Sequence, residues 1–142
     1  MTQLEFKQNS HLHPELTDPA TANLDGAAKL LGHWVNTNHE TRGIAECIVA
    51  RAADGISVSV IGVGEDGPIR WPTVKANALA NLEEEAGQRS MALAATFNLG
   101  FMRAETHMRV NKGVFVIVLF ATFLDDSGRS NYLNREFFYR EA

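Results

Sequence analysis

Residues 113–124 read GVFVIVLFATFL, and residues 131–140 read NYLNREFFYR. Both runs are rich in β-branched and aromatic residues, which favour extended strands. Residues 125–130, DDSGRS, lie between them and supply turn formers and a glycine that can adopt positive φ. The pattern predicts a β-hairpin whose first strand is apolar on both faces.

Six further strand-like runs precede this hairpin, each followed by a short segment rich in turn-forming residues. The fourth run is ambiguous, because its alternating pattern favours a strand while its Ala, Leu and Glu content would equally suit a helix. Pro72 interrupts it, so an edge strand or a bulged strand is expected there. The expected ranges are 32–38, 44–53, 56–63, 69–82, 90–98 and 101–110.

The predicted fold class is all-β, because no segment offers a helical crossover of useful length. Short connections between successive strands imply antiparallel neighbours. Eight such strands form either an open sheet or a closed up-and-down β-barrel, whose interior can hold one small ligand. Residues 1–23 are expected to form a polar N-terminal arm, and residues 24–142 a single domain that begins with a short helical turn.

Composition narrows the function classes. The 142 residues carry a net charge of −4 and no basic stripe, so nucleic acid is not expected as a partner. No apolar run is long enough to span a bilayer as a helix, and residues 1–19 do not resemble a secretory signal, so a cytoplasmic protein without membrane insertion is expected. Zinc-ligand spacing, phosphate loops and dinucleotide fingerprints are absent from the sequence, so neither a metal nor a cofactor is expected.

The tripeptide Gly32-His33-Trp34 opens the first strand directly after the expected helical turn. It resembles the first strand of the calycin superfamily, which comprises lipocalins, avidins and fatty-acid-binding proteins. The resemblance favours closure of the eight strands, so that residues 24–142 form a lipocalin-like up-and-down barrel. It also implies that Trp34 plugs one end of this barrel and that a cation from the last strand, Arg135 or Arg140, packs across its indole. The triplet at residues 135–137 also resembles the R-x-Y motif with which fatty-acid-binding proteins grip a carboxylate, with Phe replacing Tyr.

Several candidate residues have both a structural and a functional interpretation. Arg135 either packs on Trp34 or points into the barrel as an anchor for a ligand carboxylate. Trp71 either lines the barrel mouth or is a partly exposed surface ring. Glu105 and His107 share a strand face and would form an acid–base pair, but the opposite face is apolar, so both are expected outside the barrel. The expected ligand-binding set is Trp34, Trp71, Met91, Phe97, Met102, Met108, Arg135, Phe137 and Tyr139.

Two functions from different classes fit a barrel of this kind. The first is binding of a small, mostly apolar molecule inside a lipocalin-like barrel. The second is an enzyme, a cyclase or isomerase of a polyketide- or terpenoid-like substrate, that holds one reactive conformer; no catalytic residue can be assigned to it. A homodimer is also expected, because residues 114–124 are apolar on both faces and only one face can line the interior.

Overall fold

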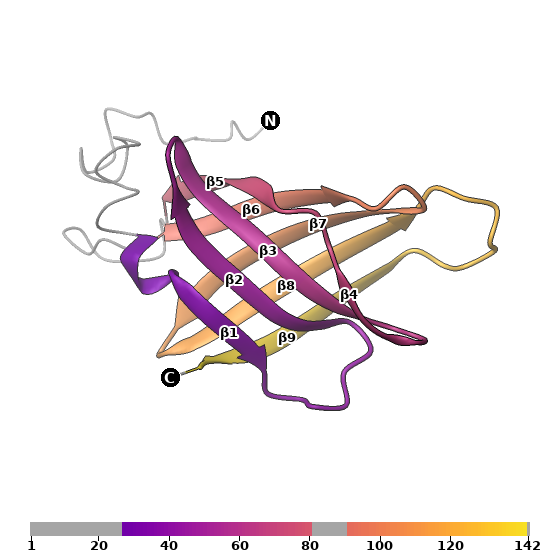
Figure 1. Ribbon diagram of the computed structural model, residues 1–142, viewed down its shortest axis with the longest axis horizontal. Helices are drawn as coiled ribbons and strands as arrows, with labels where there is room; N and C mark the ends of the chain where they lie inside the picture. Colours follow the sequence, from indigo (N-terminus) through magenta and orange to yellow (C-terminus); the bar gives the residue numbers. More distant parts are fainter. Residues whose placement is uncertain (1–26, 81–90, 142) are drawn as a thin grey trace, which may run out of the picture.

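The computed structural model describes residues 27–80 and 91–141 and contains nine strands (Figure 1). A 3-10 turn at Ala27–Lys29 precedes them. The predicted arm lies outside the described residues. No helix in the described ranges is long and apolar enough to cross a membrane. The strands are β1 (Gly32–Asn36), β2 (Ile44–Ala52), β3 (Gly55–Gly64), β4 (Gly67–Arg70), β5 (Val74–Ala80), β6 (Met91–Asn98), β7 (Met102–Asn111), β8 (Val114–Phe123) and β9 (Tyr132–Arg140).

Eight of these strands close into a barrel, and every pair of neighbours is antiparallel. The hydrogen-bonded order is β2-β1-β9-β8-β7-β6-β5-β3-β4, and an additional pairing of β2 with β3 closes the ring. The extra strand β4 pairs with β3 alone, beyond the part of β3 that pairs with β5. Closure of the sheet removes the free edges that an open sheet would expose.

The run at residues 69–82 is two strands rather than the expected single one. β4 ends at Arg70 and β5 begins at Val74, with Pro72 in the gap between them. Proline has no backbone N–H and cannot donate to a sheet ladder, so it falls where the chain passes from one strand to the next. Both strands then use β3 as partner, β4 at its C-terminal half and β5 at its N-terminal half.

The predicted orientation of β7 is confirmed. Its residues alternate strictly between buried and exposed from Met102 to Arg109, with Glu105 and His107 on the outer face. β8 also alternates, although both of its faces are apolar. The inner side chains of the two strands join one core that fills much of the barrel: Met102, Ala104, Thr106, Met108, Phe115, Ile117, Leu119 and Ala121.

The ligand-binding set places Arg135, Phe137 and Tyr139 of β9 inside the barrel, and this expectation is wrong. Arg135, Phe137 and Tyr139 lie on the outer face, and the alternate residues turn inward. Opposite residues of an antiparallel pair project to the same side of a sheet. The pairing of buried Phe115 with buried Phe138 therefore fixes which residues of β9 face the core.

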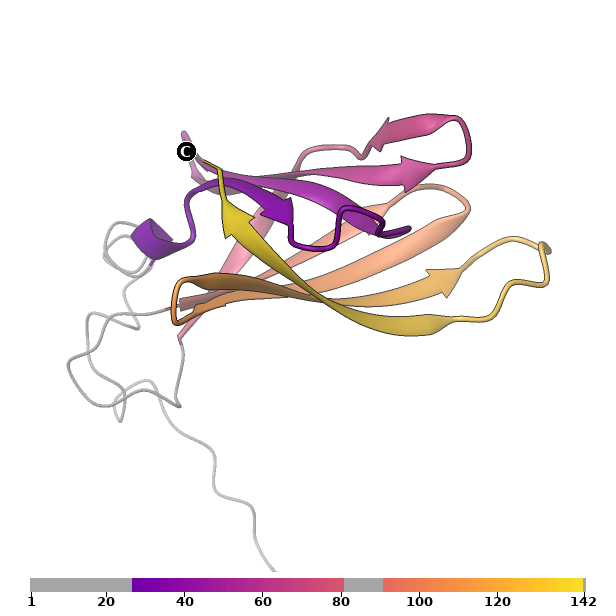
Figure 2. The ribbon, with the colours of Figure 1, turned by 90° about the horizontal axis from the view of Figure 1, so that it is seen from below.

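The barrel is plugged at one end, on the left in Figures 1 and 2. There the indole of Trp34 stacks on Phe115 with ring centroids 4.7 Å apart, and its Nε1 donates to the backbone oxygen of Leu30 at 2.9 Å. The cation across the indole is Arg140, whose Cζ lies 4.6 Å from the ring centroid. Of the two arginines that the resemblance offered, Arg140 rather than Arg135 therefore packs on Trp34.

Candidate functional site

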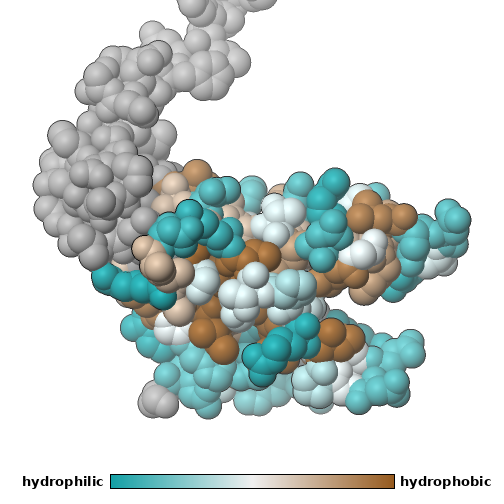
Figure 3. Space-filling model, turned by 45° about the horizontal axis from the view of Figure 1, so that its top comes forward, coloured by the Kyte–Doolittle hydropathy of each residue, from teal (hydrophilic) through white to brown (hydrophobic). Residues whose placement is uncertain are grey.

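The opposite end of the barrel is open. The β1–β2 loop, the β3–β4 turn, the β6–β7 turn and the β8–β9 loop all lie there, on the right in Figure 1. The space-filling view shows a hollow at this end with apolar side chains on both sides (Figure 3). This mouth pocket has a volume of about 580 Å³. It is lined by Arg42, Gly43, Gly62, Val63, Gly64, Glu65, Ile69, Arg70, Trp71, Pro72, Asn98, Leu99, Phe101, Met102, Leu119, Phe123, Arg129 and Tyr132.

The deepest wall of the mouth pocket is apolar. Met102 and Leu119 are buried inner residues of β7 and β8, and Trp71 is only 8% exposed. The Trp71 ring meets the edge of Phe97 at a centroid distance of 5.2 Å and an angle of 67°. An edge-to-face contact of this kind holds a buried aromatic ring in one orientation.

Gly62 of β3 makes room for the Trp71 indole. A Cβ atom added at Gly62 would lie 2.7 Å from Trp71 Nε1 and 3.2 Å from Cε2. The glycine therefore allows the indole to lie against the backbone of β3, and its Nε1 edge meets that strand. Among the described residues, this N–H donates no hydrogen bond to a protein acceptor.

The rim carries an arginine with several contacts. Arg129 in the β8–β9 loop lies over the ring of Phe123 at 4.4 Å and over Phe101 at 5.0 Å. Its guanidinium donates to Asp125 at 3.0 Å and to Ser127 at 2.8 Å. Hydrogen bonding by Ser127 is the main reason that the pKa of Asp125 is lowered, and the Arg129 charge adds to it. These contacts stabilise the β8–β9 loop over two aromatic rings.

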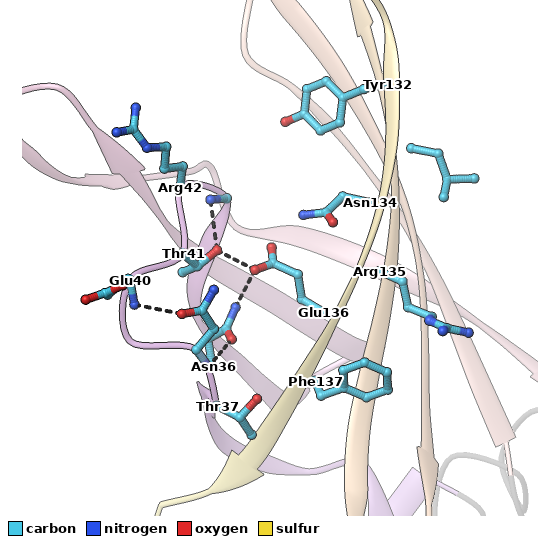
Figure 4. Close-up of a pocket in the computed structure, with 13 residues that line it drawn as sticks. Asn36, Thr37, Glu40, Thr41, Arg42, Tyr132, Asn134, Arg135, Glu136 and Phe137 are labelled. Carbon is cyan, nitrogen blue, oxygen red and sulfur yellow. Dashed lines mark hydrogen bonds between the residues drawn. The ribbon is translucent and has the colours of Figure 1, made fainter.

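A second, more polar cavity adjoins the mouth pocket and shares Arg42, Gly43 and Tyr132 with it. This loop groove, of about 620 Å³, lies between residues 36–43 and residues 132–137. In Figure 4, Tyr132, Asn134 and Glu136 project from β9 toward the loop, whereas Arg135 and Phe137 project away from it. The figure thus shows the alternation of β9 directly.

Glu136 is the centre of the loop groove. One carboxylate oxygen accepts hydrogen bonds from the Asn36 amide at 2.6 Å and from the Thr41 hydroxyl. The other accepts from the backbone N–H of Ile44 at 3.2 Å. Asn36, which is 3% exposed, also donates to the Ile44 carbonyl at 2.8 Å. The carboxylate therefore ties the β1–β2 loop to β9, which is a structural role.

Tyr132 stands where the two cavities meet. Burial, and after it the negative charge of Glu136, raise the pKa of its phenol above the usual 10. At neutral pH this hydroxyl is therefore protonated and can donate a hydrogen bond.

The structure brings only part of the expected ligand-binding set to the open end. Trp71 and Met102 line the mouth pocket, and Phe97 supports Trp71 from beneath. Trp34 and Met108 are buried in the core and do not line the mouth pocket. Met91 begins β6, and its side chain is outside the described part of the chain. Three expected members lie on the outer surface: Arg135, Phe137 and Tyr139.

Leu119, Phe123, Arg42 and Arg129 line the mouth pocket without having been predicted as site residues. Leu119 and Phe123 lie on the same face of β8. Both faces of that strand are apolar, so the sequence alone could not show which face points inward. The two arginines lie in loops, and only barrel closure brings these loops together. The available signal was topological: in an antiparallel meander the β1–β2 and β8–β9 loops lie at the same end, so charged residues in both loops are candidates for one site.

The single cysteine, Cys47, is a core residue. It is fully buried on β2, and burial raises the pKa of its thiol to about 12. Because the thiolate is the reactive form, this cysteine is not a nucleophile near neutral pH.

Within the described ranges, one group of side chains could hold a metal ion: His33, Glu46 and Glu141. The ring nitrogens of His33 point to different carboxylates, Nε2 to Glu46 at 2.6 Å and Nδ1 to Glu141 at 2.8 Å. A single metal ion would use one nitrogen and would require one carboxylate to move. As it stands, His33 links β1 to β2 through Glu46 and to the residue after β9 through Glu141.

The architecture is a closed antiparallel barrel of eight strands with one extra strand, which is compatible with a calycin-like fold. Comparisons of the chain with protein-family models, with curated proteins and with solved structures found no match.

Proposed function

We propose that this protein binds a small, mostly apolar molecule in the mouth pocket, as a calycin-like barrel would. The observation that carries the proposal is the difference between the two ends of the barrel. One end is filled by Trp34, Phe115 and Arg140, whereas the other holds a cavity of about 580 Å³ with an apolar floor. That volume falls within the range of roughly 300–1,000 Å³ typical of small-molecule sites.

The lining of the mouth pocket supports an apolar ligand body. Trp71, Met102, Leu119 and Phe123 offer aromatic and flexible surfaces, which adapt to apolar molecules of different shapes. The loop groove is a weaker candidate for such a ligand, because its central carboxylate is already bonded to Asn36, Thr41 and Ile44.

Native mass spectrometry of the purified protein, followed by identification of any released molecule, tests the proposal. We expect a bound species that is lost from the variant Met102→Trp, because a larger inner side chain fills the pocket. The matched control is Arg103→Trp, since Arg103 is the next residue of β7 and lies on the outer face. Equal retention of the ligand by both variants would contradict the assignment of the mouth pocket.

The enzymatic alternative, a cyclase or isomerase that templates its substrate, retains one supporting observation. Tyr132 remains protonated beside the pocket and could polarise a substrate carbonyl by donating a hydrogen bond. Chromatography of the identified ligand after prolonged incubation distinguishes the two functions, since a binding protein returns the molecule unchanged and an enzyme returns an isomer.

A further inference from the structure

The two tryptophans of the chain differ in one respect that concerns the ligand. Trp34 donates its indole N–H to the Leu30 carbonyl, as a buried donor normally does. Trp71 is more than nine-tenths buried and lines the mouth pocket, yet its N–H has no acceptor among the described residues. In the wall of a cavity, a donor without a protein acceptor is available to an acceptor atom of a bound molecule.

A cation lies on the same rim as this donor. The Nε1 edge of Trp71 lies against Gly62. The next residue, Val63, donates its backbone N–H to the carbonyl of Gly43 at 3.0 Å, and Arg42 directly precedes Gly43. Arg42 and the residue against which Trp71 Nε1 lies, Gly62, are therefore on two neighbouring segments that this hydrogen bond joins. Figure 4 shows the Arg42 side chain extending away from Glu136.

The charges of the mouth pocket are predominantly positive. Arg42, Arg70 and Arg129 line it, and Glu65 is the single carboxylate among its lining residues. Arg129 is already paired with Asp125. Arg42 has no ion-pair partner within the described part of the chain.

Two side-chain acceptors close to this rim, on Glu136 and Asn98, are already bonded. The carboxylate of Glu136 is occupied by the β1–β2 loop, and the side-chain oxygen of Asn98 accepts the backbone N–H of Gly100 at 2.9 Å. Tyr132 adds a further donor. The pocket therefore offers mostly donors to a ligand above an apolar floor.

We propose that the ligand of the mouth pocket carries a carboxylate, which accepts the indole N–H of Trp71 and pairs with the guanidinium of Arg42, while its apolar body lies on Met102, Leu119 and Phe123. This inference rests on the proposed function and specifies its ligand class. A carboxylate satisfies the buried donor and the cation together, because its two oxygens accept hydrogen bonds in one plane. An alcohol would satisfy the donor alone, and an ammonium group would satisfy neither.

Three probes with the same apolar body test the proposal: octanoate, octan-1-ol and octylamine at pH 7. Saturated probes cause no ring-current shifts, so the indole N–H signals of ¹⁵N-labelled protein report hydrogen bonding. Two such signals are expected, and the variant Trp71→Phe assigns them. We expect octanoate to move the Trp71 signal downfield and to leave the Trp34 signal in place.

Titrations should show octanoate binding about ten- to a hundredfold more tightly than octan-1-ol, as hydrogen bonds to a charged group imply. Arg42→Gln should remove most of that preference, because the exposed cation is lost while the apolar floor remains. Arg103→Gln, on the outer face of β7, is the matched control and should change neither affinity.

Two different results would overturn the reasoning. Equal affinities for octanoate and octan-1-ol, with backbone signals of the mouth pocket shifting for both, would refute the carboxylate and leave the apolar site intact. No shift of pocket signals with any of the three probes would refute the proposed apolar site together with the inference.

Discussion

Replacing Arg140 by Ala tests how the plugged end of the barrel is held together. The guanidinium covers the Trp34 ring at 4.6 Å, and its Nη2 donates to the backbone oxygen of Lys29 at 2.8 Å. The residue is largely exposed, so the cation–π contact is worth about 0.5–1 kcal/mol. The hydrogen bond from a charged donor adds about 1 kcal/mol once its exposure is considered. The expected loss in the free energy of unfolding is therefore about 1.5–2 kcal/mol.

The matched control is Arg135→Ala, since Arg135 lies on the same strand but faces outward, with its Cζ 5.4 Å from the ring of Phe137. An exposed substitution of this kind should change stability by less than about 0.5 kcal/mol. Arg140→Lys should fall between the two, because lysine keeps the charge but loses the flat surface that covers an indole. Thermal and urea unfolding measure all three, and for a domain of this size the Arg140→Ala midpoint should fall by about 5–10 °C.

A result in which Arg140→Ala is no more destabilised than Arg135→Ala would refute this account of the plugged end. Gly32, two residues before Trp34, provides an independent check. Gly32 has a φ of 142°, and a Cβ there would lie 3.1 Å from Arg140 Nε. Gly32→Ala should therefore weaken the same contact in the presence of Arg140 and should cost less in the Arg140→Ala background.

Four further predictions concern other parts of the barrel. Gly62→Ala places a Cβ 2.7 Å from Trp71 Nε1, so the indole must move, and a changed Trp71 fluorescence with a smaller mouth pocket in a crystal structure is expected. Glu136→Gln removes acceptors from the β1–β2 loop and should cost about 1–3 kcal/mol, with faster hydrogen exchange at Ile44 as the specific readout. The Cys47 thiol should resist a thiol reagent at pH 8 until the protein unfolds, and because folding raises its pKa from 9.0 to about 12, its stabilising contribution should be lost as pH rises through that interval. The homodimer remains a prediction: Phe137→Glu on the outer face should yield a monomer in sedimentation if the apolar surface of β8 and β9 pairs with a second copy, and an unchanged mass would contradict it.

The barrel strands were largely predictable because their turns and alternation are local signals. β7 shows this well: charged residues at alternate positions assign its outer face before any partner strand is known. β9 shows the opposite case, since Phe137 and Phe138 are adjacent and both parities contain an aromatic ring and an arginine. Its orientation is set by its pairing with β8, which is apolar on both faces and offers no clue of its own. Which face of β9 points inward depends on its register with β8, and this register cannot be inferred from the pattern of β9 alone.

The candidate site was less predictable for a different reason. The plugged end depends on a glycine and a tryptophan two residues apart, so a short sequence pattern can indicate it. The mouth pocket combines Trp71 with loop residues such as Arg42 and Arg129, which lie far from it in the sequence. Neither arginine belongs to a periodic pattern, and their proximity to Trp71 exists only once β2 pairs with β3 and the ring is closed.

The difference between the two tryptophans also argues against a barrel that is merely a filled core. Buried indole donors are usually satisfied by protein acceptors, because an unpaired N–H costs free energy. Here the donor at the plugged end has a backbone acceptor at 2.9 Å, while the donor at the open end has none among the described residues. Gly62 makes room for the indole in this position, because an alanine Cβ there would lie 2.7 Å from Nε1. Local departures from ideal pairing are expected at functional sites. The indole N–H without a protein acceptor belongs to Trp71, which lines the open end of the barrel.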